Sequence, residues 1–277
     1  MNEREQADAN DREEGWDDGR HDGKQPRGEF VQSLARGLSV LQAFGAEHSS
    51  MTLADVARRS GLTRATARRL LHTFEALGYM TQTDRRFELT PRVLDLGYAY
   101  VSSLQLPAIA QPFMEALSER VNESVSVAVL DDTDIVYVAR VPTKHVMSIS
   151  LGLGSRLPAA LTSMGRAILA GLASDDLDAF LGRATWTPRT TRSIRFADEL
   201  RHAVARARRD GYAVLDEELE DNVRSVAAPL HDGRGRTVAA INVGTSVARV
   251  SLTDLHERIV PELLSAAASI SAQLAKR

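Results

Sequence analysis

Residues 52–78 read TLADVARRSGLTRATARRLLHTFEALG, and this stretch decides the fold of the N-terminal part of the chain. Thr52 is a good N-cap for a short helix, and Asp55, three residues later, can complete a capping box. The helix breaks around Gly61, because glycine supplies the backbone freedom that a tight turn needs. Thr63 then caps a second helix, which the last glycine of the stretch ends. The stretch therefore predicts two helices joined by a sharp turn.

The second of these helices has an apolar back and a cationic front. Its inner face is predicted to be Ala67, Leu70, Leu71, Phe74 and Leu77. The residues expected to contact DNA are Thr63, Arg64, Thr66, Arg68, Arg69 and His72. The major groove of B-DNA takes one α-helix, and arginine can bind guanine through two hydrogen bonds or pair with phosphate. Arginines on a helix are also a common solvated face, so the DNA-binding interpretation depends on the helix-turn-helix around them.

Beyond this helix the apolar period changes from helical to alternating. Residues 79–83 and 86–90 are predicted strands, joined as a hairpin at Asp84 and Arg85. The turn lacks the Asn-Gly or Asp-Gly pair that favours tight hairpins. The hairpin resembles the wing of a winged helix-turn-helix, and Arg85 and Arg86 are expected to contact the flanking DNA backbone or minor groove.

One amphipathic helix is predicted on each side of this module. Residues 30–44 carry an apolar stripe at helical spacing, formed by Val31, Leu34, Leu38, Leu41 and Phe44. Residues 91–106 are predicted to form a linker helix, which Pro107 breaks.

The remainder of the chain mixes helices with strands. Helical periodicity is found at 107–121, 163–172, 174–182, 196–210 and 252–275. Strands are predicted at 123–130, 134–141, 145–151, 212–216, 223–230 and 236–244, with hairpin turns at 131–134 and 231–235. The predicted fold class is α+β, with a winged helix-turn-helix at 29–90, a linker helix at 91–106, and an antiparallel sheet with helical layers at 107–277.

Charge is distributed unevenly along the chain of 277 residues, whose net charge is −3. Residues 1–28 hold nine acidic and five basic side chains and almost no large apolar ones, so they are predicted to be a disordered acidic tail. Residues 52–86 hold seven arginines against three acids. There is no cysteine, and no apolar run approaches the roughly 20 residues of a membrane span. We therefore expect a cytoplasmic protein with no membrane partner, no cofactor and no metal.

Catalytic motifs are incomplete in this sequence. Ser163 lacks the glycine two positions earlier that a nucleophile elbow needs, and His256-Glu257 is not followed by a second histidine at Val260. Gly152-Leu153-Gly154 lacks the third glycine of a dinucleotide-binding loop. An enzyme is therefore the disfavoured alternative. A DNA-binding protein without ligand control is a second alternative. A ligand-dependent change in DNA affinity would distinguish a sensor from such a protein.

Several stretches together resemble the IclR family of bacterial transcriptional regulators, from about Phe30 to the C-terminus. In the N-terminal part they are SLARGLSVL (33–41), LADVA (53–57) and GLTRATARRLL (61–71). Farther along the chain they are LPAALTSMGRA (157–167), DGYAVLDEE (210–218), SVAAPL (225–230) and AAINV (239–243). The segments 30–34 and 157–166 resemble most the branch that controls aromatic catabolism through the β-ketoadipate pathway, the protocatechuate and 4-hydroxybenzoate regulators.

The resemblance implies that residues 107–277 are a GAF-like effector domain, that the linker helix dimerises, and that the protein is a homodimer or tetramer. Matched residue by residue, it implies an effector pocket lined by Ser163, Met164, Asp216, Ser225, Asn242 and Gly244. A small organic acid would suit such a pocket. It could interact with the hydroxyl and amide groups of this set, with the start of the 163–172 helix and with Arg156. Ser163 and Thr162 are equally good as plain N-caps, and Asp216 could belong to an exposed acidic turn.

Overall fold

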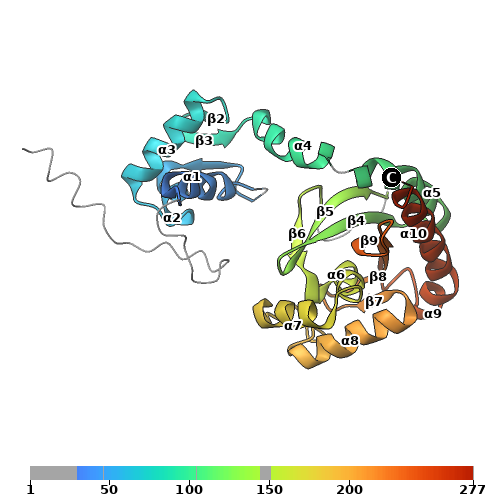
Figure 1. Ribbon diagram of the computed structural model, residues 1–277. Helices are drawn as coiled ribbons and strands as arrows, with labels where there is room; N and C mark the ends of the chain where they lie inside the picture. Colours follow the sequence, from blue (N-terminus) through green and yellow to red (C-terminus); the bar gives the residue numbers. More distant parts are fainter. Residues whose placement is uncertain (1–29, 46, 104, 144–150, 277) are drawn as a thin grey trace, which may run out of the picture. The chain divides into compact units, whose positions relative to one another are not determined.

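The computed structural model describes residues 30–45, 47–103, 105–143 and 151–276 (Figure 1). The predicted acidic tail therefore lies outside the described residues. The chain divides into two compact units between Leu94 and Asp95. In the described part of the chain, no helix has the length and apolar character needed to cross a membrane.

The first unit is a small helical module with a three-stranded antiparallel sheet, ordered β1-β3-β2. Its elements are α1 (Gln32–Gln42), β1 (Ser50–Thr52), α2 (Leu53–Arg59), α3 (Arg64–Ala76), β2 (Met80–Thr83) and β3 (Arg86–Leu89). Its core consists of Val40, Ala43, Met51, Val56, Leu71, Met80 and Phe87. The strand β1 was not predicted, because three residues are too few to show alternation; only Met51 points into the core.

The local signals that predicted this module are confirmed. The Thr52 hydroxyl accepts the Asp55 N–H at 3.3 Å while the Asp55 carboxylate accepts the Thr52 N–H, which completes the capping box. The Thr52 hydroxyl also donates to the Asp55 carboxylate at 2.7 Å, and this bond, together with the one from the Thr52 N–H, lowers the pKa of Asp55. Gly61 has φ +67°, in the left-handed region that its turn requires. At the hairpin tip Asp84 and Arg85 both have positive φ, as a type I′ turn demands even without glycine.

The predicted inner faces of α1 and α3 are partly wrong. The side chain of Leu77 is exposed, and so are Leu34 and Leu38 of α1. Helix α1 instead buries Gly37 and Val40, packs Leu41 and Phe44 of the predicted stripe partly against the core, and contacts α3. A stripe at helical spacing shows that a helix has an apolar face, but it does not show what covers that face.

Helical segments around the predicted linker span the boundary between the two units. A 3₁₀ turn, η1 (Pro91–Val93), precedes α4 (Leu94–Ser103), and α5 spans Gln105–Val121. The prediction that Pro107 breaks a helix is wrong. Pro107 lies in the first turn of α5, where backbone N–H groups have no partner within the helix and a missing N–H costs little.

A six-stranded antiparallel sheet, ordered β6-β5-β4-β9-β8-β7, forms the centre of the second unit. Its strands are β4 (Ser124–Asp131), β5 (Asp134–Val141), β6 (Arg156–Pro158), β7 (Ala213–Asp216), β8 (Val223–His231) and β9 (Thr237–Ser246). The helical segments are η2 (Ala159–Leu161), α6 (Ser163–Leu169), α7 (Ser174–Arg183), α8 (Ala197–Asp210), α9 (Leu252–Asp254), η3 (Leu255–Ile259) and α10 (Val260–Leu274). The α+β class is confirmed, β6 was missed, and the predicted strand 145–151 falls on undescribed residues except Leu151.

The two faces of this sheet differ in chemistry. Helices α5 and α10 cover one face, and α6 lies against the other with α7 and α8 beyond it (Figure 1). On the α5 and α10 side the strands bury apolar residues such as Val125, Val127 and Ile241. Since side chains alternate along a strand, Ser126 and Asn242 point to the α6 side. The candidate functional site of the second unit lies against this polar region of an otherwise apolar sheet.

Candidate functional site

Helix α3 presents basic side chains to solvent. Arg64, Arg68 and Arg69 are exposed, and none of their guanidinium groups has a hydrogen-bond or ion-pair partner among the described residues. The Thr63 hydroxyl caps the helix by accepting the Thr66 N–H at 3.2 Å. The exposed His72 places Nδ1 3.1 Å from a carboxylate oxygen of Glu75. The first turns of α3 therefore carry three guanidinium groups that are available to a partner.

The two arginines of the wing differ in their surroundings. Arg86 donates hydrogen bonds from Nε to the Ser50 hydroxyl, at 3.1 Å, and from its guanidinium to the Ser50 carbonyl, so it fastens β3 to β1. Arg85 is exposed at the tip and has no such partner within the described part of the chain. The ring of His72 lies edge-on to Phe87 of β3, with 6.2 Å between ring centroids, so α3 and the wing are packed together.

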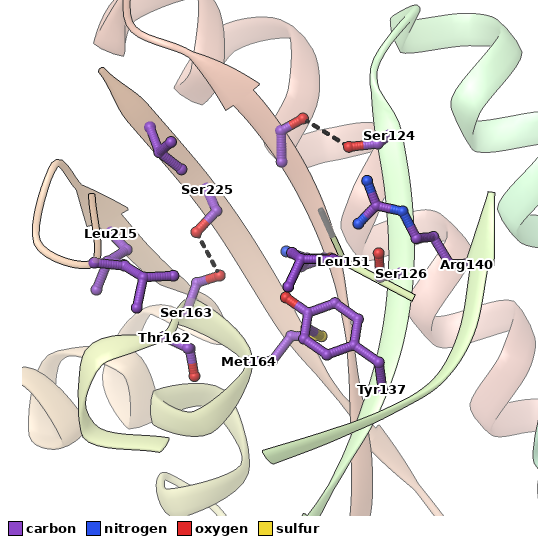
Figure 2. Close-up of a pocket in the computed structure, with 14 residues that line it drawn as sticks. Ser124, Ser126, Tyr137, Arg140, Leu151, Thr162, Ser163, Met164, Leu215 and Ser225 are labelled. Atoms are coloured by element: carbon purple, nitrogen blue, oxygen red, sulfur yellow. Dashed lines mark hydrogen bonds between the residues drawn. The ribbon is translucent and has the colours of Figure 1, made fainter. Parts of the chain in front are cut away.

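A cavity opens between α6 and the polar face of the large sheet (Figure 2). Its polar lining consists of Ser124, Ser126, Tyr137, Arg140, Thr162, Ser163, Ser225 and Asn242, and the remainder of Leu151, Met164, Leu215, Leu219, Val223 and Gly244. One cationic side chain among several hydroxyl, amide and apolar groups is a suitable environment for a small organic anion.

Five of the six predicted pocket residues meet in this cavity: Ser163, Met164, Ser225, Asn242 and Gly244. The Ser163 and Ser225 hydroxyls lie 2.8 Å apart and connect α6 to β8. Thr162 is the N-cap of α6, accepting the Gly165 N–H at 3.0 Å. The capping role therefore belongs to Thr162, while Ser163 faces the cavity.

The structure does not bring Asp216 to the cavity. Its neighbour Leu215 lines the cavity, and alternation along β7 turns Asp216 the other way. The Asp216 carboxylate pairs with Arg224 at 2.6 Å and with Arg192 at 2.9 Å. Asp216 is thus part of an ion-pair cluster at the end of the strand.

The charge expected from Arg156 is supplied by another residue. Arg156 pairs with Asp131 at 2.6 Å and Asp134 at 3.3 Å, at the turn between β4 and β5. The half-buried Arg140 lines the cavity instead, and it has no partner among the described residues. The undescribed residues 144–150 contain no aspartate or glutamate. Among the described residues that line the cavity, Arg140 is therefore the one cation, and no carboxylate of the described chain neutralises it.

A β-bulge brings Arg140 and Tyr137 to the same wall (Figure 2). The pairing shifts at Val127 and Ala128, so that Ser126 faces Arg140 while Ala128 faces Tyr137. Without the bulge, two residues three positions apart would point to opposite faces. Burial raises the pKa of Tyr137 to about 12, so its hydroxyl is neutral at ordinary pH.

Several lining residues were missed by sequence reasoning. The alternation Ser124-Val125-Ser126-Val127 was a usable signal, because it predicts a strand with one polar face toward the interior. Arg140 and Tyr137 offered no such signal, since a bulge cannot be read from this sequence.

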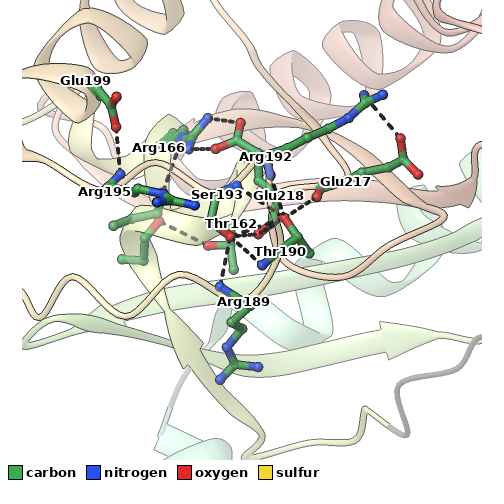
Figure 3. A network of polar contacts seen from close by, with 12 residues as sticks. Thr162, Arg166, Arg189, Thr190, Arg192, Ser193, Arg195, Glu199, Glu217 and Glu218 are labelled. Atoms are coloured by element: carbon green, nitrogen blue, oxygen red, sulfur yellow. Dashed lines mark hydrogen bonds and ion pairs between the residues drawn. The ribbon is translucent and has the colours of Figure 1, made fainter.

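A buried ion pair supports the wall of the cavity from behind (Figure 3). Arg166 of α6, only 3% exposed, forms two hydrogen bonds to the Glu218 carboxylate, at 2.7 and 2.5 Å, and a third to the Ala160 carbonyl at 3.0 Å. Ser193 donates to the Glu218 carbonyl at 2.5 Å. The network thus ties α6 to the loop between β7 and β8. This loop supplies Leu219 to the cavity, and the two strands supply Leu215 and Val223.

Comparison with known proteins identifies both units. A profile described as "IclR helix-turn-helix domain" matches residues 33–84, and one described as "Bacterial transcriptional regulator IclR C-terminal" matches residues 98–272. The Pca regulon regulatory protein of Pseudomonas putida is 41% identical over 247 residues, which are 89% of this chain and 85% of that protein. The p-hydroxybenzoate hydroxylase transcriptional activator of Acinetobacter baylyi is 32% identical, over 86% of this chain and 90% of its own.

Solved structures agree with these matches. A Rhodococcus sp. RHA1 protein assigned as a transcriptional regulator has a TM-score of 0.80 and 52% identity, covering 89% of this chain and 99% of its own. An IclR homologue of Microbacterium hydrocarbonoxydans, solved in complex with 4-hydroxybenzoate, has a TM-score of 0.77 and 25% identity, covering 88% of this chain and all of its own (100%).

Proposed function

Because the chain belongs to the IclR family of bacterial transcriptional regulators, we propose that α3 reads operator DNA while a small acid in the cavity of the second unit controls that binding. The family consists of regulators rather than enzymes, in agreement with the incomplete catalytic motifs. We retain the proposed division into a DNA-binding domain at 29–90, a linker helix at 91–106 and an effector domain at 107–277. A regulator of bacterial genes acts in the cytoplasm, where its DNA is.

The DNA contacts that we propose start from the exposed front of α3. Arg64, Arg68 and Arg69 are free to reach base edges or phosphates, while Thr63, Thr66 and His72 lie on the same helix. Arg85 at the wing tip suits the neighbouring backbone or minor groove. Arg86 also holds Ser50, so we assign it a supporting role beside any phosphate contact.

The effector that we propose is a small aromatic acid that controls genes of aromatic-acid catabolism. The observation that carries this proposal is Arg140, a cation without an acidic partner in the described chain, in a cavity that otherwise has hydroxyl and apolar walls. A carboxylate would neutralise it through charge-assisted hydrogen bonds. Relatives named for the Pca regulon and for p-hydroxybenzoate hydroxylase, and a neighbour holding 4-hydroxybenzoate, support this class of ligand.

We expect effector binding to shift the protein between states whose paired recognition helices have different spacing. A symmetric reader needs its two helices at the spacing of its half-sites, so such a shift changes DNA affinity.

Removing the cation of the cavity is expected to abolish most of the effector response. Arg140→Met should raise the acid concentration needed to change operator binding at least about tenfold, because a hydrogen bond to a charged group contributes about 1.5–3 kcal/mol. Operator affinity without effector should stay unchanged. The measurement is fluorescence anisotropy of the upstream intergenic DNA, titrated with protocatechuate, 4-hydroxybenzoate and β-ketoadipate.

Arg156→Met is the matched control, since Arg156 is also an arginine of this sheet but pairs with Asp131 and Asp134 away from the cavity. It should respond as the unmodified protein does. An unchanged response of Arg140→Met would place the acid elsewhere. If no acid altered DNA affinity, the protein would be a DNA-binding protein without this form of ligand control.

Exposed apolar side chains support a homodimer as the basic assembly. In α1, Val31 at the N-cap and Leu34 are 60% and 63% exposed, and in α4, Leu94 and Tyr98 are 73% and 70% exposed. Large apolar side chains gathered on one element indicate an interaction surface. A second copy of the chain is the partner that we propose, because a symmetric reader of paired half-sites requires one.

A charge among the exposed apolar side chains of α1 is expected to weaken the assembly. Leu34→Glu should shift the sedimentation coefficient of the full-length protein toward that of a monomer at micromolar concentration, whereas Gln42→Glu, at an exposed polar position of the same helix, should not. Equal sedimentation of Leu34→Glu and the unmodified protein would remove α1 from the interface.

A further inference from the structure

We propose that Asn242 selects the effector by its hydroxyl group, so that the ligand is a hydroxylated aromatic acid that donates a hydrogen bond to Asn242 Oδ1. This inference rests on the proposed function of the cavity and adds a second chemical requirement to the carboxylate held by Arg140.

The starting observation is the Oδ1 atom of Asn242. Among the described residues it is the one buried side-chain oxygen or nitrogen that has no hydrogen-bond partner. Leaving a buried polar atom unpaired is costly, and such atoms in folded proteins call for an explanation by function. Because Asn242 lines the cavity, a ligand can supply the missing donor.

Three serine hydroxyls of the cavity lining already have hydrogen-bond partners. The neighbouring Ser163 and Ser225 hydroxyls bond to each other, and Ser124 donates to the Gly244 carbonyl at 3.2 Å. Apart from the hydroxyls, the lining near the sheet includes Met164 and Leu215, which suit the faces of a ring. A hydrogen-bond donor on an apolar frame would match both Oδ1 and these walls, and a phenolic hydroxyl is such a group.

The strand register places the two proposed ligand contacts, Arg140 and Asn242, on one line across the sheet. Ser126 of β4 faces Arg140 of β5 on one side and Asn242 of β9 on the other. Neighbouring strands lie about 4.8 Å apart, so the backbones at Arg140 and Asn242 are about 10 Å apart with Ser126 between them. A ligand that keeps its carboxylate on Arg140 and extends over Ser126 brings its other end to Asn242.

Tyr137 is compatible with this arrangement. Its hydroxyl lines the same wall, and burial keeps it protonated, so it places no negative charge beside the ligand carboxylate. The amide of Asn242 also carries a donor group, and an amide turned by half a rotation would instead favour a ligand acceptor. 4-Methoxybenzoate offers an acceptor and no donor at that position, so its affinity relative to that of the hydroxybenzoates distinguishes these two orientations of the amide.

The test is isothermal titration of the full-length protein with 3-hydroxybenzoate, 4-hydroxybenzoate, 4-methoxybenzoate and benzoate. We expect the better hydroxybenzoate to bind at least about tenfold more tightly than benzoate and 4-methoxybenzoate, because only the hydroxyl donates to Oδ1. Asn242→Leu, which has a similar volume, should bind all four acids within about twofold of one another.

A second measurement separates a binding role from a structural one. Since Asn242→Leu removes an unpaired buried oxygen, its melting temperature without ligand should equal or exceed that of the unmodified protein. A marked fall would show that the amide supports the fold and would overturn its assignment as a ligand selector. The comparison of hydroxy- with methoxybenzoate on the unmodified protein needs no variant at all.

The outcomes distinguish this inference from the proposed function. Equal affinity for hydroxybenzoates and benzoate, with Arg140→Met weakening all of them, would overturn the role of Asn242 and keep the acid site. Preserved selectivity in Asn242→Leu would assign the hydroxyl to another residue. If none of the four acids bound, the proposed aromatic effector would fail together with this inference.

Discussion

Replacing Arg68 with alanine is expected to weaken operator binding by about 1–3 kcal/mol, roughly 5- to 150-fold, if its guanidinium reads a base edge. The side chain is exposed on α3 and has no partner within the described residues, so the substitution removes a DNA contact without breaking an interaction inside the protein. Arg64, one turn earlier on the same helix, should behave in the same way. Fluorescence anisotropy of operator and unrelated DNA at two salt concentrations measures the effect.

The two DNAs distinguish base reading from phosphate pairing. If Arg68 binds a base, its replacement lowers affinity for operator but hardly for unrelated DNA, whereas replacing a phosphate-binding arginine weakens both and reduces the salt dependence. Arg58→Ala is the control, because Arg58 belongs to the preceding helix and pairs with Asp55 at 2.7 Å. Full operator affinity in both Arg64→Ala and Arg68→Ala would mean that α3 is not the reading helix.

Glu218→Gln is expected to destabilise the second unit by about 3–5 kcal/mol, because it leaves the Arg166 guanidinium buried without its carboxylate. Arg166 is 3% and Glu218 15% exposed, so water can replace little of the missing interaction. The measurement is urea unfolding monitored on the transition of the second unit, since two compact units need not unfold together.

Two further variants test the cause. Arg166→Met combined with Glu218→Gln should recover part of the stability, because the double variant leaves no unpaired buried charge. Arg183→Met, which breaks the exposed pair with Asp132, should cost less than about 1 kcal/mol. A Glu218→Gln protein as stable as the unmodified one would show that the pair adds nothing to the fold.

We expect Glu218→Gln to distort the cavity as well as to lower the stability of the second unit. Glu218 lies in the loop that supplies Leu219 to the cavity, and Arg166 lies one helical turn from Ser163. The pair thus holds two walls of the site in place.

Much of the fold could be predicted because its signals are local. The capping box of Thr52 and Asp55, the turn at Gly61 and the cap at Thr63 each involve residues within a few positions of one another. Local hydrogen bonding and backbone freedom determine such features whatever the surroundings. The same holds for the alternation that predicted most strands of the large sheet.

What the sequence by itself determined is therefore the helix-turn-helix with its basic front, the α+β class and five residues of the cavity. Only the tertiary structure decided which cation enters the cavity, which side of α1 is buried, and that Asp216 belongs to an ion-pair cluster. Arg140 and Arg156 are indistinguishable as residue types; the bulge at Val127 and Ala128 and the acidic turn beside β6 assign one to the cavity and the other to the surface. The physical reason is that strand register and ion pairing join residues distant in the chain, and no short-range pattern records them.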